Sequence, residues 1–597
     1  MKRKLVWVLV SGLMVLSLVM ASCGPAEEEA EVEVGEEEVE VGEVEVSEEE
    51  GVGEEEEVSP EGPQYGGTFI HRVGSDPNIW EGWFGMGTDG WGMHATLTYE
   101  NIATGDWVNV PMDTWDFRQI YYPASYAMSL LVESWETEDL QTLTFHVRQG
   151  VHFHDKPPTN GREMTAEDVK FSWDRLLGVG SGYTTPSPYA SIPGYGPVES
   201  ITVTDKYTVV VKTANASIGY LTQFLQVSDA YVTPKDAVEQ YGDLNFWTRS
   251  IGTGPFVIQD YIPGASMTYD RNPSYWGTDE RYPALENQLP YVDHVKVLII
   301  PDLTTAISAL RTGKVDRLTG VAADRGLTVS ETNPELAAYT TTMGMPGGIA
   351  IKVTSPPFDN IKVRKAMQMS LDLETIAKTH YGGIPDGKPC AGVISYPGFS
   401  APYEDWPQDV KDGFAYNPEG AKQLLVEAGY PNGFSCTVIA PSYADMDLLQ
   451  IMKAYFSDIN VDMEIQAMDA AAARAYAFAG NADLTSGVIA FRLPSAPTTS
   501  ILTYTTSHGW YEIHQINDPH YEELVANAVA AMDEDEQMRL CRECDMYSIS
   551  RFWAITVQPT YSTAFYQPWI KDIVLAKDFT NVARLWIDQD MKKSLGH

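Results

Sequence analysis

Two short groups of side chains in this 597-residue chain have spacings that could support metal or redox chemistry. His152 and His154 alternate along one extended segment beside an aspartate, so a strand would present both imidazoles on one face. Cys541 and Cys544 form a C-x-x-C pair within a predicted helix. Neither group is complete, because structural zinc sites use four ligands in recognisable spacings. We expect the histidines to face solvent and the cysteines to be structural, either as a disulfide or as buried thiols.

Other catalytic motifs are missing from the sequence. The chain contains no G-x-S-x-G elbow, no H-E-x-x-H motif and no P-loop. His508, His514 and His520 fit no zinc spacing, and no carboxylate pair stands out for glycoside hydrolysis. We therefore predict a protein that is not an enzyme and uses no cofactor or metal. The 15 Trp and 32 Tyr residues indicate contacts with organic solutes, since both side chains combine an apolar face with a hydrogen-bonding group.

The N-terminus has the pattern of a secretory signal. Basic residues within Met1–Lys4 precede an apolar stretch from Leu5 to Met20, and the small residues Ala21-Ser22 then lead to Cys23. A cysteine directly after two small residues resembles the lipobox of bacterial lipoproteins, although Met20 stands where that family usually has Leu. The resemblance implies that Cys23 is acylated and begins the mature chain. An ordinary signal peptide with an incidental cysteine is the alternative.

Residues 24–62 have the composition of a tether. They include 19 glutamates among Val, Gly and Ser residues, with no Lys or Arg. Such a run repels itself and buries too little apolar surface to fold, so we expect it to be disordered. Fully extended, it would reach on the order of 130 Å. The remaining chain, about 535 residues long, is too large for one hydrophobic core and should form several domains.

The remainder of the chain is acidic. Without the tether and the signal, 64 acidic residues stand against 37 basic ones. This charge argues against nucleic acid or anionic lipid as a ligand. Beyond the signal, no apolar run approaches the roughly 18 residues of a membrane-spanning helix. We predict a monomeric, extracytoplasmic body that is lipid-anchored to the outer face of the cytoplasmic membrane, or periplasmic.

Apolar periodicity and capping signals predict the elements that would position a site. Leu143, Phe145 and Val147 share one face of a strand, and Thr165 to Asp168 opens a helix that runs through Leu177. Further predicted elements are two strands within Ser200–Lys212, a strand at His294–Ile300, a helix capped by Thr304 or Thr305 and ending at Gly313, and helices at Asp359–Lys378 and Pro418–Ala428.

A βαβαβ pattern follows in the last third of the chain. Predicted strands at Cys436–Ala440, Val461–Gln466 and Leu484–Phe491 alternate with helices at Met446–Ile459 and Ala470–Ala479. Short strands that alternate with helices indicate a parallel sheet covered on both faces. Ligands bind beyond the carboxyl ends of such strands. The residues just after Phe491 are therefore predicted to lie at a cleft.

Several segments, in this order, resemble the family-5 extracellular solute-binding proteins of ABC importers, the peptide/nickel-binding group. The likeness extends from Tyr65 to about Gln589. The segments are Leu131–Glu136 with Leu143–Asp155 and Thr165–Trp173, Gly252–Phe256, Arg271–Trp276, Ala309–Asp316, Pro357–Ala366 and Tyr416–Leu425.

The resemblance implies an α/β fold with two lobes, of the large peptide-binding type II subclass, and an extra domain inserted in the first lobe. In this family, solute is held between lobes that close about a hinge, and the closed form docks on a membrane permease served by cytoplasmic ATPases. The implied organisation is a lipoprotein signal at 1–22, a lipidated Cys23 with a disordered tether at 23–63, lobe I at 64–96, 214–302 and 555–597, the inserted domain at 97–213, and lobe II at 303–554.

The sequence constrains the identity of the ligand less than it constrains the class of protein. Peptide binders of the family place an aspartate just after the strand that corresponds to Leu484–Phe491, and here that position is Phe491, with Arg492 beside it. An arginine would repel an ammonium but can pair with a carboxylate or phosphate. We therefore predict a small organic solute, peptide-like or other, with an anionic group. Arg492 could instead point to solvent or pair with an acid, and a local shift of the alignment could give the role to another acid.

Three aromatic residues complete the predicted ligand contacts: Tyr504, Trp510 and, in the first lobe, Trp91. Packing in the core is the alternative role for each. A surface lipoprotein of the same fold that senses a ligand and signals to a receptor is the alternative function, and an extracellular hydrolase is a third. The pairing of Cys390, Cys436, Cys541 and Cys544 stays open, because four thiols permit three connectivities.

Overall fold

The structure is a computed structural model of the chain. It divides into Met1–Pro60 and a compact body, Glu61–His597. Among the described residues, no helix is both long enough and apolar enough to cross a bilayer. The described residues are 62–81, 89–119, 121–187, 197–226, 231–390, 392, 396–486, 496–507, 511–576 and 581–597.

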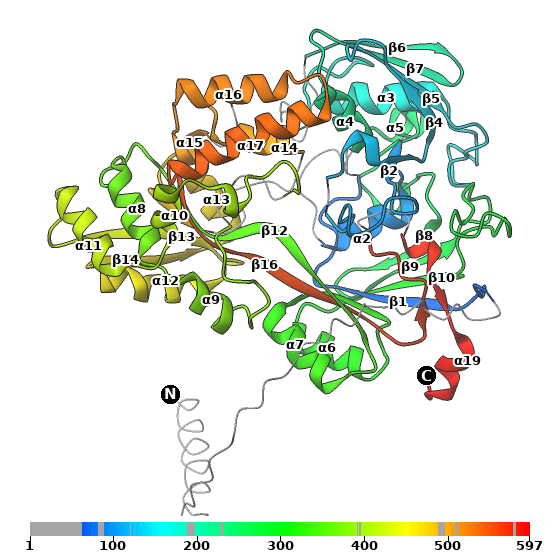
Figure 1. The fold of residues 1–597 in the computed structure, drawn as a ribbon. Helices are drawn as coiled ribbons and strands as arrows, with labels where there is room; N and C mark the ends of the chain where they lie inside the picture. Colours follow the sequence, from blue (N-terminus) through cyan, green and yellow to red (C-terminus); the bar gives the residue numbers. More distant parts are fainter. Residues whose placement is uncertain are drawn as a thin grey trace, which may run out of the picture. The chain divides into compact units, whose positions relative to one another are not determined.

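A mixed ten-stranded sheet runs through the body (Figure 1). Its strand order is β14-β13-β15-β12-β16-β11-β1-β10-β9-β8, so neighbouring strands come from distant parts of the sequence. The strands are β1 (Thr68–Val73), β8 (Phe256–Ile262), β9 (Ser266–Arg271), β10 (His294–Ile299), β11 (Arg317–Ala322), β12 (Ala337–Ile351), β13 (Phe434–Pro441), β14 (Val461–Met468), β15 (Leu484–Ser486) and β16 (Ala554–Tyr566).

Two long antiparallel strands, β12 and β16, join the two lobes. Lobe I contains β1 and β8–β10, and lobe II contains β13–β15; Figure 1 shows β12 and β16 running from one to the other. Their pairing extends from Ala337↔Tyr566 to Ala350↔Ala554, with register shifts around Pro346. Gly348 has a φ of +146°, and a Cβ there would lie 2.1 Å from the carbonyl oxygen of Ile555. The crossover therefore depends on irregular backbone that a larger residue would disturb.

Lobe II confirms the predicted parallel βαβαβ unit. β13 pairs in parallel with β14 and with β15, and α12 (Met446–Asp458) and α13 (Ala470–Phe478) connect these strands. The described part of the third strand ends at Ser486, and the rest of the predicted strand lies outside the described residues. The other helices of lobe II are α8 (Ile361–Met369), α9 (Leu373–Thr379), η4 (Tyr403–Asp405), α10 (Gln408–Phe414), α11 (Pro418–Glu427), α14 (Pro497–Ile501), η5 (Leu502–Tyr504), α15 (Tyr511–His514), α16 (Pro519–Val529) and α17 (Glu534–Ser550).

Two helix predictions need correction. The predicted single helix Asp359–Lys378 is two helices, α8 and α9, because the Asp372 side chain accepts a hydrogen bond from the Thr375 N–H and caps a new helix. The second is α6 (Leu303–Arg311), whose N-cap is Asp302 rather than either threonine. In both cases an aspartate caps the helix through the N–H three residues later. The predicted Asn417–Pro418 start of α11 is confirmed.

Lobe I also contains a separate four-stranded sheet in the order β4-β5-β7-β6. Leu143, Phe145 and Val147 of β5 are buried as predicted, and the Thr165–Asp168 capping box begins α3. The bounds of this sheet and its helix are β4 (Val132–Glu136), β5 (Thr142–Val147), β6 (Val198–Asp205), β7 (Thr208–Thr213) and α3 (Ala166–Leu177).

The remaining elements of the described structure are α2 (Asp89–Thr98), β2 (Ala103–Gly105), η1 (Ala124–Tyr126), β3 (Ala127–Ser129), α4 (Ile218–Gln226), α5 (Lys235–Tyr241), η3 (Trp247–Arg249), α7 (Ala323–Thr332), β17 (Ile570–Lys571), α18 (Asn581–Arg584), β18 (Trp586–Ile587) and α19 (Gln589–Ser594).

Several of the segments that carry the family resemblance meet inside lobe I. The carbonyl oxygen of Gly254 lies 2.9 Å from His154 Nε2 and accepts a hydrogen bond from the Asn272 side chain at 3.1 Å. Tyr275 donates to the buried carboxylate of Glu100 at 2.7 Å. These residues come from separate parts of the chain and satisfy one another's buried polar groups. At these positions the shared segments maintain the fold of lobe I.

Candidate ligand-binding site

Four of the predicted functional residues lie outside the described residues. They are the lipidation position Cys23 and the ligand-contact positions Phe491, Arg492 and Trp510. Their roles stay predictions.

Tyr504 ends η5 in lobe II and belongs to a buried aromatic cluster. Its side chain is 5% exposed, and its ring makes edge contacts with His514 at 4.9 Å and Trp553 at 5.3 Å between centroids. Tyr521 packs against the same Trp553. This packing fixes the Tyr504 ring, while its predicted contact with ligand stays a prediction.

Trp91 lies on α2 and is also buried among aromatic side chains. It is 5% exposed, and its neighbours are His94, Tyr99 and Tyr231, with ring centroids 5.8–6.1 Å apart. In the described structure the Trp91 ring forms part of the lobe I core, and its predicted contact with ligand is likewise untested.

A histidine–serine pair beneath this cluster resembles a nucleophile and its base, but it is sealed in the protein. His94 Nε2 lies 2.8 Å from Ser250 Oγ, and the other ring nitrogen lies 2.9 Å from the Tyr269 hydroxyl. His94 and Ser250 are both fully buried, and Tyr99 also hydrogen-bonds Ser250 Oγ at 2.9 Å. Burial lowers the pKa of His94 to about 3. The neutral ring therefore links buried hydroxyls and is out of reach of a substrate.

The predicted solvent-facing histidine pair is corrected for His154. His154 is 1% exposed and bound to Gly254, whereas His152 is half-buried with Nδ1 2.7 Å from the Gly161 carbonyl oxygen. The described residues contain no cluster of three metal-ligating side chains. Cys541 and Cys544 on α17 are buried free thiols, one of the two alternatives considered.

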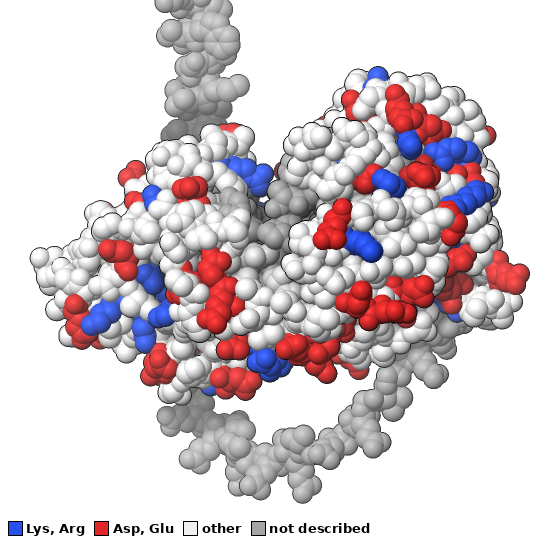
Figure 2. Space-filling view, turned by 90° about the horizontal axis from the view of Figure 1, so that it is seen from above, with Lys and Arg blue, Asp and Glu red and all other residues white. Residues whose placement is uncertain are grey.

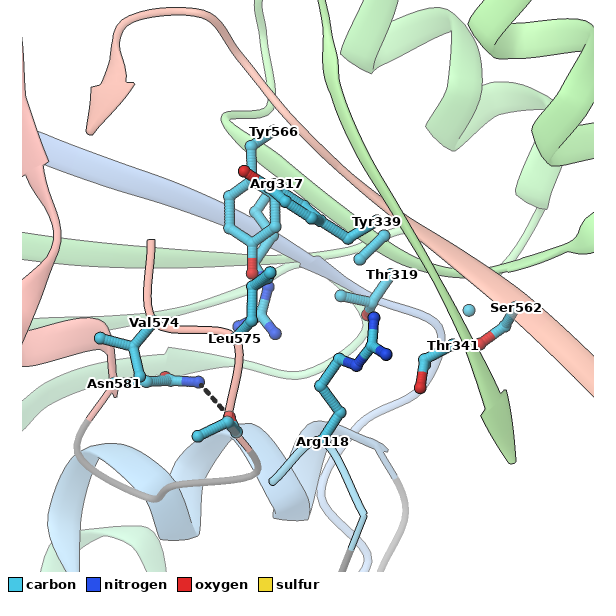
Figure 3. Close-up of a pocket in the computed structure, with 13 residues that line it drawn as sticks. Arg118, Arg317, Thr319, Tyr339, Thr341, Ser562, Tyr566, Val574, Leu575 and Asn581 are labelled. Atoms are coloured by element: carbon cyan, nitrogen blue, oxygen red, sulfur yellow. Dashed lines mark hydrogen bonds between the residues drawn. The ribbon is translucent and has the colours of Figure 1, made fainter. Parts of the chain in front are cut away.

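The site that best suits a solute is a cavity of about 190 Å³ on one face of β11, β12 and β16 (Figure 3). We refer to these three adjacent strands, two of which pass between the lobes, as the crossing strands. Alternate residues of three adjacent strands line it, as expected for side chains on one face of a sheet. The residues between them, such as Leu318 and Phe565, pack on the opposite face against α6 and α7. The lining comprises Arg317 and Thr319 from β11, Tyr339 and Thr341 from β12, and Ser562, Ala564 and Tyr566 from β16, together with Arg118, Gly320, Val574, Leu575, Ala576 and Asn581.

Arg118 reaches this cavity from the aromatic loop, which we define as residues 106–119 and 121–123 between β2 and η1. Asp116 binds its guanidinium through two hydrogen bonds of 2.8 and 2.9 Å, and the Thr340 carbonyl oxygen accepts a third at 3.2 Å. Trp115 and Tyr121 of the same loop pack against Tyr396 in lobe II. The loop thus places a fixed cation over the crossing strands.

Arg317 lies at the start of β11 and enters the same space. Its guanidinium carbon is 5.4 Å from the centre of the Tyr566 ring, and its Nε is buried without a hydrogen-bond partner. Among the described residues, no carboxylate pairs with it. Burial, followed by the charges of Arg317 and Arg72, holds the pKa of the neighbouring His71 well below its usual range. In Figure 3 both guanidinium groups extend into the space between loop and strands, so the cavity is suited to an anionic group.

A second cavity, of about 270 Å³, is lined entirely by lobe II residues, including Asp372, Asp386, Lys388 and Tyr416. It carries both signs of charge and does not touch the crossing strands. The space-filling view in Figure 2 shows a hollow between the two lobes, with acidic side chains spread over both. We take the first cavity as the candidate site because its lining includes residues of β12 and β16, the strands that join the lobes.

Two lobes joined by crossing strands, with a cavity at the crossover, define a protein that binds a solute between its lobes. The chain belongs to the bacterial extracellular solute-binding proteins, family 5, whose model of the middle region matches residues 127–511. It is therefore an extracytoplasmic substrate-binding protein of an ABC importer, with the two-lobed type II fold.

Individual relatives are distant. The chain is 26% identical to heme-binding protein A of Haemophilus influenzae, over 70% of this chain and 76% of the relative. It is 26% identical to the glutathione-binding protein GsiB of Salmonella typhimurium, over 68% and 75%. The structure of DppA from Helicobacter pylori in complex with the peptide STSA has a TM-score of 0.70 at 20% identity, covering 88% of this chain and 99% of DppA. That last likeness establishes the fold alone.

The sequence reasoning missed Arg118 and Arg317. A usable signal was present for Arg317, because Arg317, Leu318 and Thr319 alternate between polar and apolar directly after the family-like segment that ends at Asp316. No comparable signal marks Arg118, since its aromatic loop has no periodicity and its position depends on contacts with lobe II.

Proposed function

We propose that this chain is the lipid-anchored solute-binding protein of an ABC importer, which captures a small organic solute between its lobes and delivers it unchanged to the membrane permease. The observation that carries the proposal is the cavity on β12 and β16, the strands through which the lobes are joined, and on the neighbouring β11. A solute held there would contact the part of the fold that must move when the lobes open and close. Solute then stabilises the closed form through its higher affinity for that form.

The solute is proposed to be peptide-like or a related organic compound with an anionic group. Two features support the anionic group: the uncompensated Arg317 at the cavity and the replacement of an aspartate by Phe491 and Arg492 in the sequence. The relatives that bind heme and glutathione show that members of this family take ligands other than ordinary peptides. Identity near 26% does not transfer either ligand to this chain.

The test of this function is mass spectrometry of small molecules released from gently denatured, purified protein. A defined solute should be recovered in stoichiometric amount and should rebind without chemical change. Rebinding should raise thermal stability by mass action, by about 2.7 kcal/mol at a hundred times Kd. Glutathione, the dipeptide Met-Leu and heme serve as a first panel in the same assay. A protein that releases nothing and is stabilised by no solute, or one that converts its solute into product, contradicts the proposal.

Lipid anchoring is tested separately with Cys23→Ser. The wild-type protein should partition into detergent and membrane fractions, because more than one acyl chain is needed for stable anchoring. The C23S variant should appear in the aqueous fraction with unchanged solute affinity. Cys436→Ser, at a half-buried free thiol of the body, is the matched control and should remain with the membrane.

A further inference from the structure

We propose that Arg118 and Arg317 form a subsite that binds a carboxylate of the solute. Arg317 is the main anchor, and Arg118, which the aromatic loop holds over the cavity, binds the carboxylate from the other side. This inference rests on the proposed solute-binding function and deepens it by assigning the chemical group that the cavity recognises. Neither arginine belongs to the segments that carried the family resemblance.

Arg317 has unused binding capacity. Its guanidinium makes no hydrogen bond or ion pair with the described residues, although its Nε is shielded from solvent. Tyr566 packs against the guanidinium at 5.4 Å, and Arg317 is one of the residues that line the cavity. A half-buried guanidinium without a partner is costly unless an acceptor binds it, and a carboxylate can take two parallel N–H donors at once.

Arg118 has a fixed orientation, but only part of its hydrogen-bonding capacity is used. Asp116 and the Thr340 carbonyl oxygen take three of the five N–H groups of the guanidinium. Two N–H groups remain, and the loop holds them over the cavity. Asp116 offsets the charge of Arg118, so the site as a whole carries about one positive charge, from Arg317. That balance suits a single carboxylate better than a doubly charged phosphate.

The rest of the lining fits one end of a solute. Hydroxyl groups of Thr319, Thr341 and Ser562 face the same cavity and can donate further hydrogen bonds to carboxylate oxygens. A volume of about 190 Å³ is below the roughly 300–1,000 Å³ of complete small-molecule sites, so the remainder of the solute extends beyond the cavity. The carboxylate could belong to a peptide or to a sugar acid, and the test separates these sources.

The experiment compares the wild-type protein with Arg317→Gln, Arg118→Gln and Arg317→Lys. Arg539→Gln is the control, because Arg539 is an exposed arginine on α17 whose partner is Glu543. Affinities are measured by thermal shift and calorimetry for trialanine and gluconate, each beside its neutral amide, trialanine amide and gluconamide. Mass spectrometry of solute released from each variant is the second readout. Far-UV circular dichroism and unliganded Tm confirm that each variant is folded.

We expect the wild-type protein to bind at least one of the acids and to bind its amide at least tenfold more weakly. R317Q should lose at least tenfold in affinity for that acid, R118Q about threefold to tenfold, and R317K an intermediate amount, while R539Q behaves as wild type. The source of the carboxylate is the peptide if trialanine binds and the sugar acid if gluconate binds.

Equal binding of acid and amide, no binding of either acid, or full affinity in folded R317Q and R118Q would overturn the subsite. If R317Q does not fold, the affinities of R118Q and R317K for the acid test the subsite in its place. A solute that is released from the wild-type protein but lacks a carboxylate, or is retained equally by R317Q, refutes this inference and leaves the proposed function standing. Absence of any released or rebound solute refutes the proposed function itself.

Discussion

Arg364 on α8 is a buried arginine held by main-chain carbonyl groups. Its guanidinium donates to the carbonyl oxygens of Phe552 at 2.9 Å, Phe358 at 2.7 Å and Arg551 at 2.9 Å. Burial, and then the charge of Arg551, lowers the pKa of Arg364 to about 10, so it stays charged at neutral pH. This one side chain therefore fixes α8 to the turn that leads into β16. It explains why an arginine appears in the segment Pro357–Ala366 that resembles the family.

We expect Arg364→Lys to destabilise the protein by about 2–4 kcal/mol, because an ammonium group cannot satisfy three separated carbonyl oxygens in a buried site. Urea unfolding at pH 7 measures the loss. Lys365→Gln is the matched control, since Lys365 is the next residue and donates at the exposed surface to the Asp409 carbonyl oxygen. That control should stay within about 0.5 kcal/mol of wild type. An Arg364→Lys protein as stable as the control would show that the three contacts do not hold the crossover.

Buried histidines make the stability depend on pH. Burial lowers the pKa of His94 to about 3 and that of His154 to about 4, in each case below the usual histidine pKa of about 6.5. The unfolded chain then binds protons before the folded chain does as the pH falls below 6.5. The ion pair with Asp445 raises the pKa of half-buried His380 and works in the opposite direction. That pair is partly exposed, so solvent screening makes its effect the smaller one.

The free energy of unfolding should therefore fall as the pH is lowered from about 6.5 to 4. The expected slope from each buried histidine is about 1.4 kcal/mol per pH unit. His154→Gln should be less stable at pH 7 but should show a shallower decline, because one of the buried histidines no longer titrates. Urea unfolding at half-unit pH steps measures both slopes. Parallel curves for the variant and the wild type would mean that His154 is accessible to protons in the folded state.

At the scale of elements, the sequence was informative wherever structure is set by neighbours along the chain. The alternation of Leu143, Phe145 and Val147, the Asn417–Pro418 start of α11 and the βαβ order of lobe II all depend on local periodicity or capping, and all are confirmed. The break between α8 and α9 was missed because the apolar stripe continues across it, while the Asp372 cap competes with helix continuation.

The candidate site could not be predicted from local sequence patterns in this way. Arg317 and Tyr566 are opposite one another only because β11 and β16 pair antiparallel, which follows from the closing of the whole sheet. Arg118 is brought to them by packing of Trp115 on Tyr396. Non-local pairing of this kind leaves no periodic mark in the sequence. The sequence analysis accordingly predicted ligand contacts in lobe II and, for Trp91, in lobe I, and it missed the cavity on β11, β12 and β16.

Two polar contacts connect the lobes away from the crossover. The Glu534 carboxylate, in the first turn of α17, accepts hydrogen bonds from the Ser125 N–H at 3.0 Å and hydroxyl at 2.6 Å. Ser217, just before α4, donates its hydroxyl to the Val529 carbonyl oxygen at 2.6 Å, and the Ile218 N–H donates to Ala531. These contacts bridge elements of lobe I and lobe II. The lobes are therefore in direct contact at α17 and at the end of α16.

Glu534→Gln should weaken solute binding by about twofold to fivefold, which corresponds to about 0.5–1 kcal/mol for one partly exposed charge-assisted contact. The effect should appear mainly as faster solute release, because the contact exists only when the lobes are together. Stopped-flow dissociation kinetics measure it. Asp535→Asn, an exposed acid in the same helical turn, is the control and should leave release unchanged. Identical release rates for both variants would show that this contact persists in the open form.

At the scale of the whole molecule, the fold couples the solute site to the relative position of the lobes. The cavity lies on β11, β12 and β16, and β12 and β16 are also the strands that pass between the lobes. Between the cavity and lobe II, the pairing of these two strands is irregular around Pro346 and Gly348. A solute seated there, with the aromatic loop over it, therefore contacts the same two strands that continue through the irregular segment into lobe II.

This coupling predicts that saturating solute reduces the radius of gyration of the unliganded protein. The comparison uses protein that begins at residue 62, the first residue that the structure describes. Solute binds the closed form with higher affinity and shifts the population toward it, so the profile with solute should match the described structure. Small-angle X-ray scattering with and without solute measures the change. Glu534→Gln should contract to the same final size but require more solute, whereas a radius that does not change at saturation would show that the lobes are already closed before solute binds.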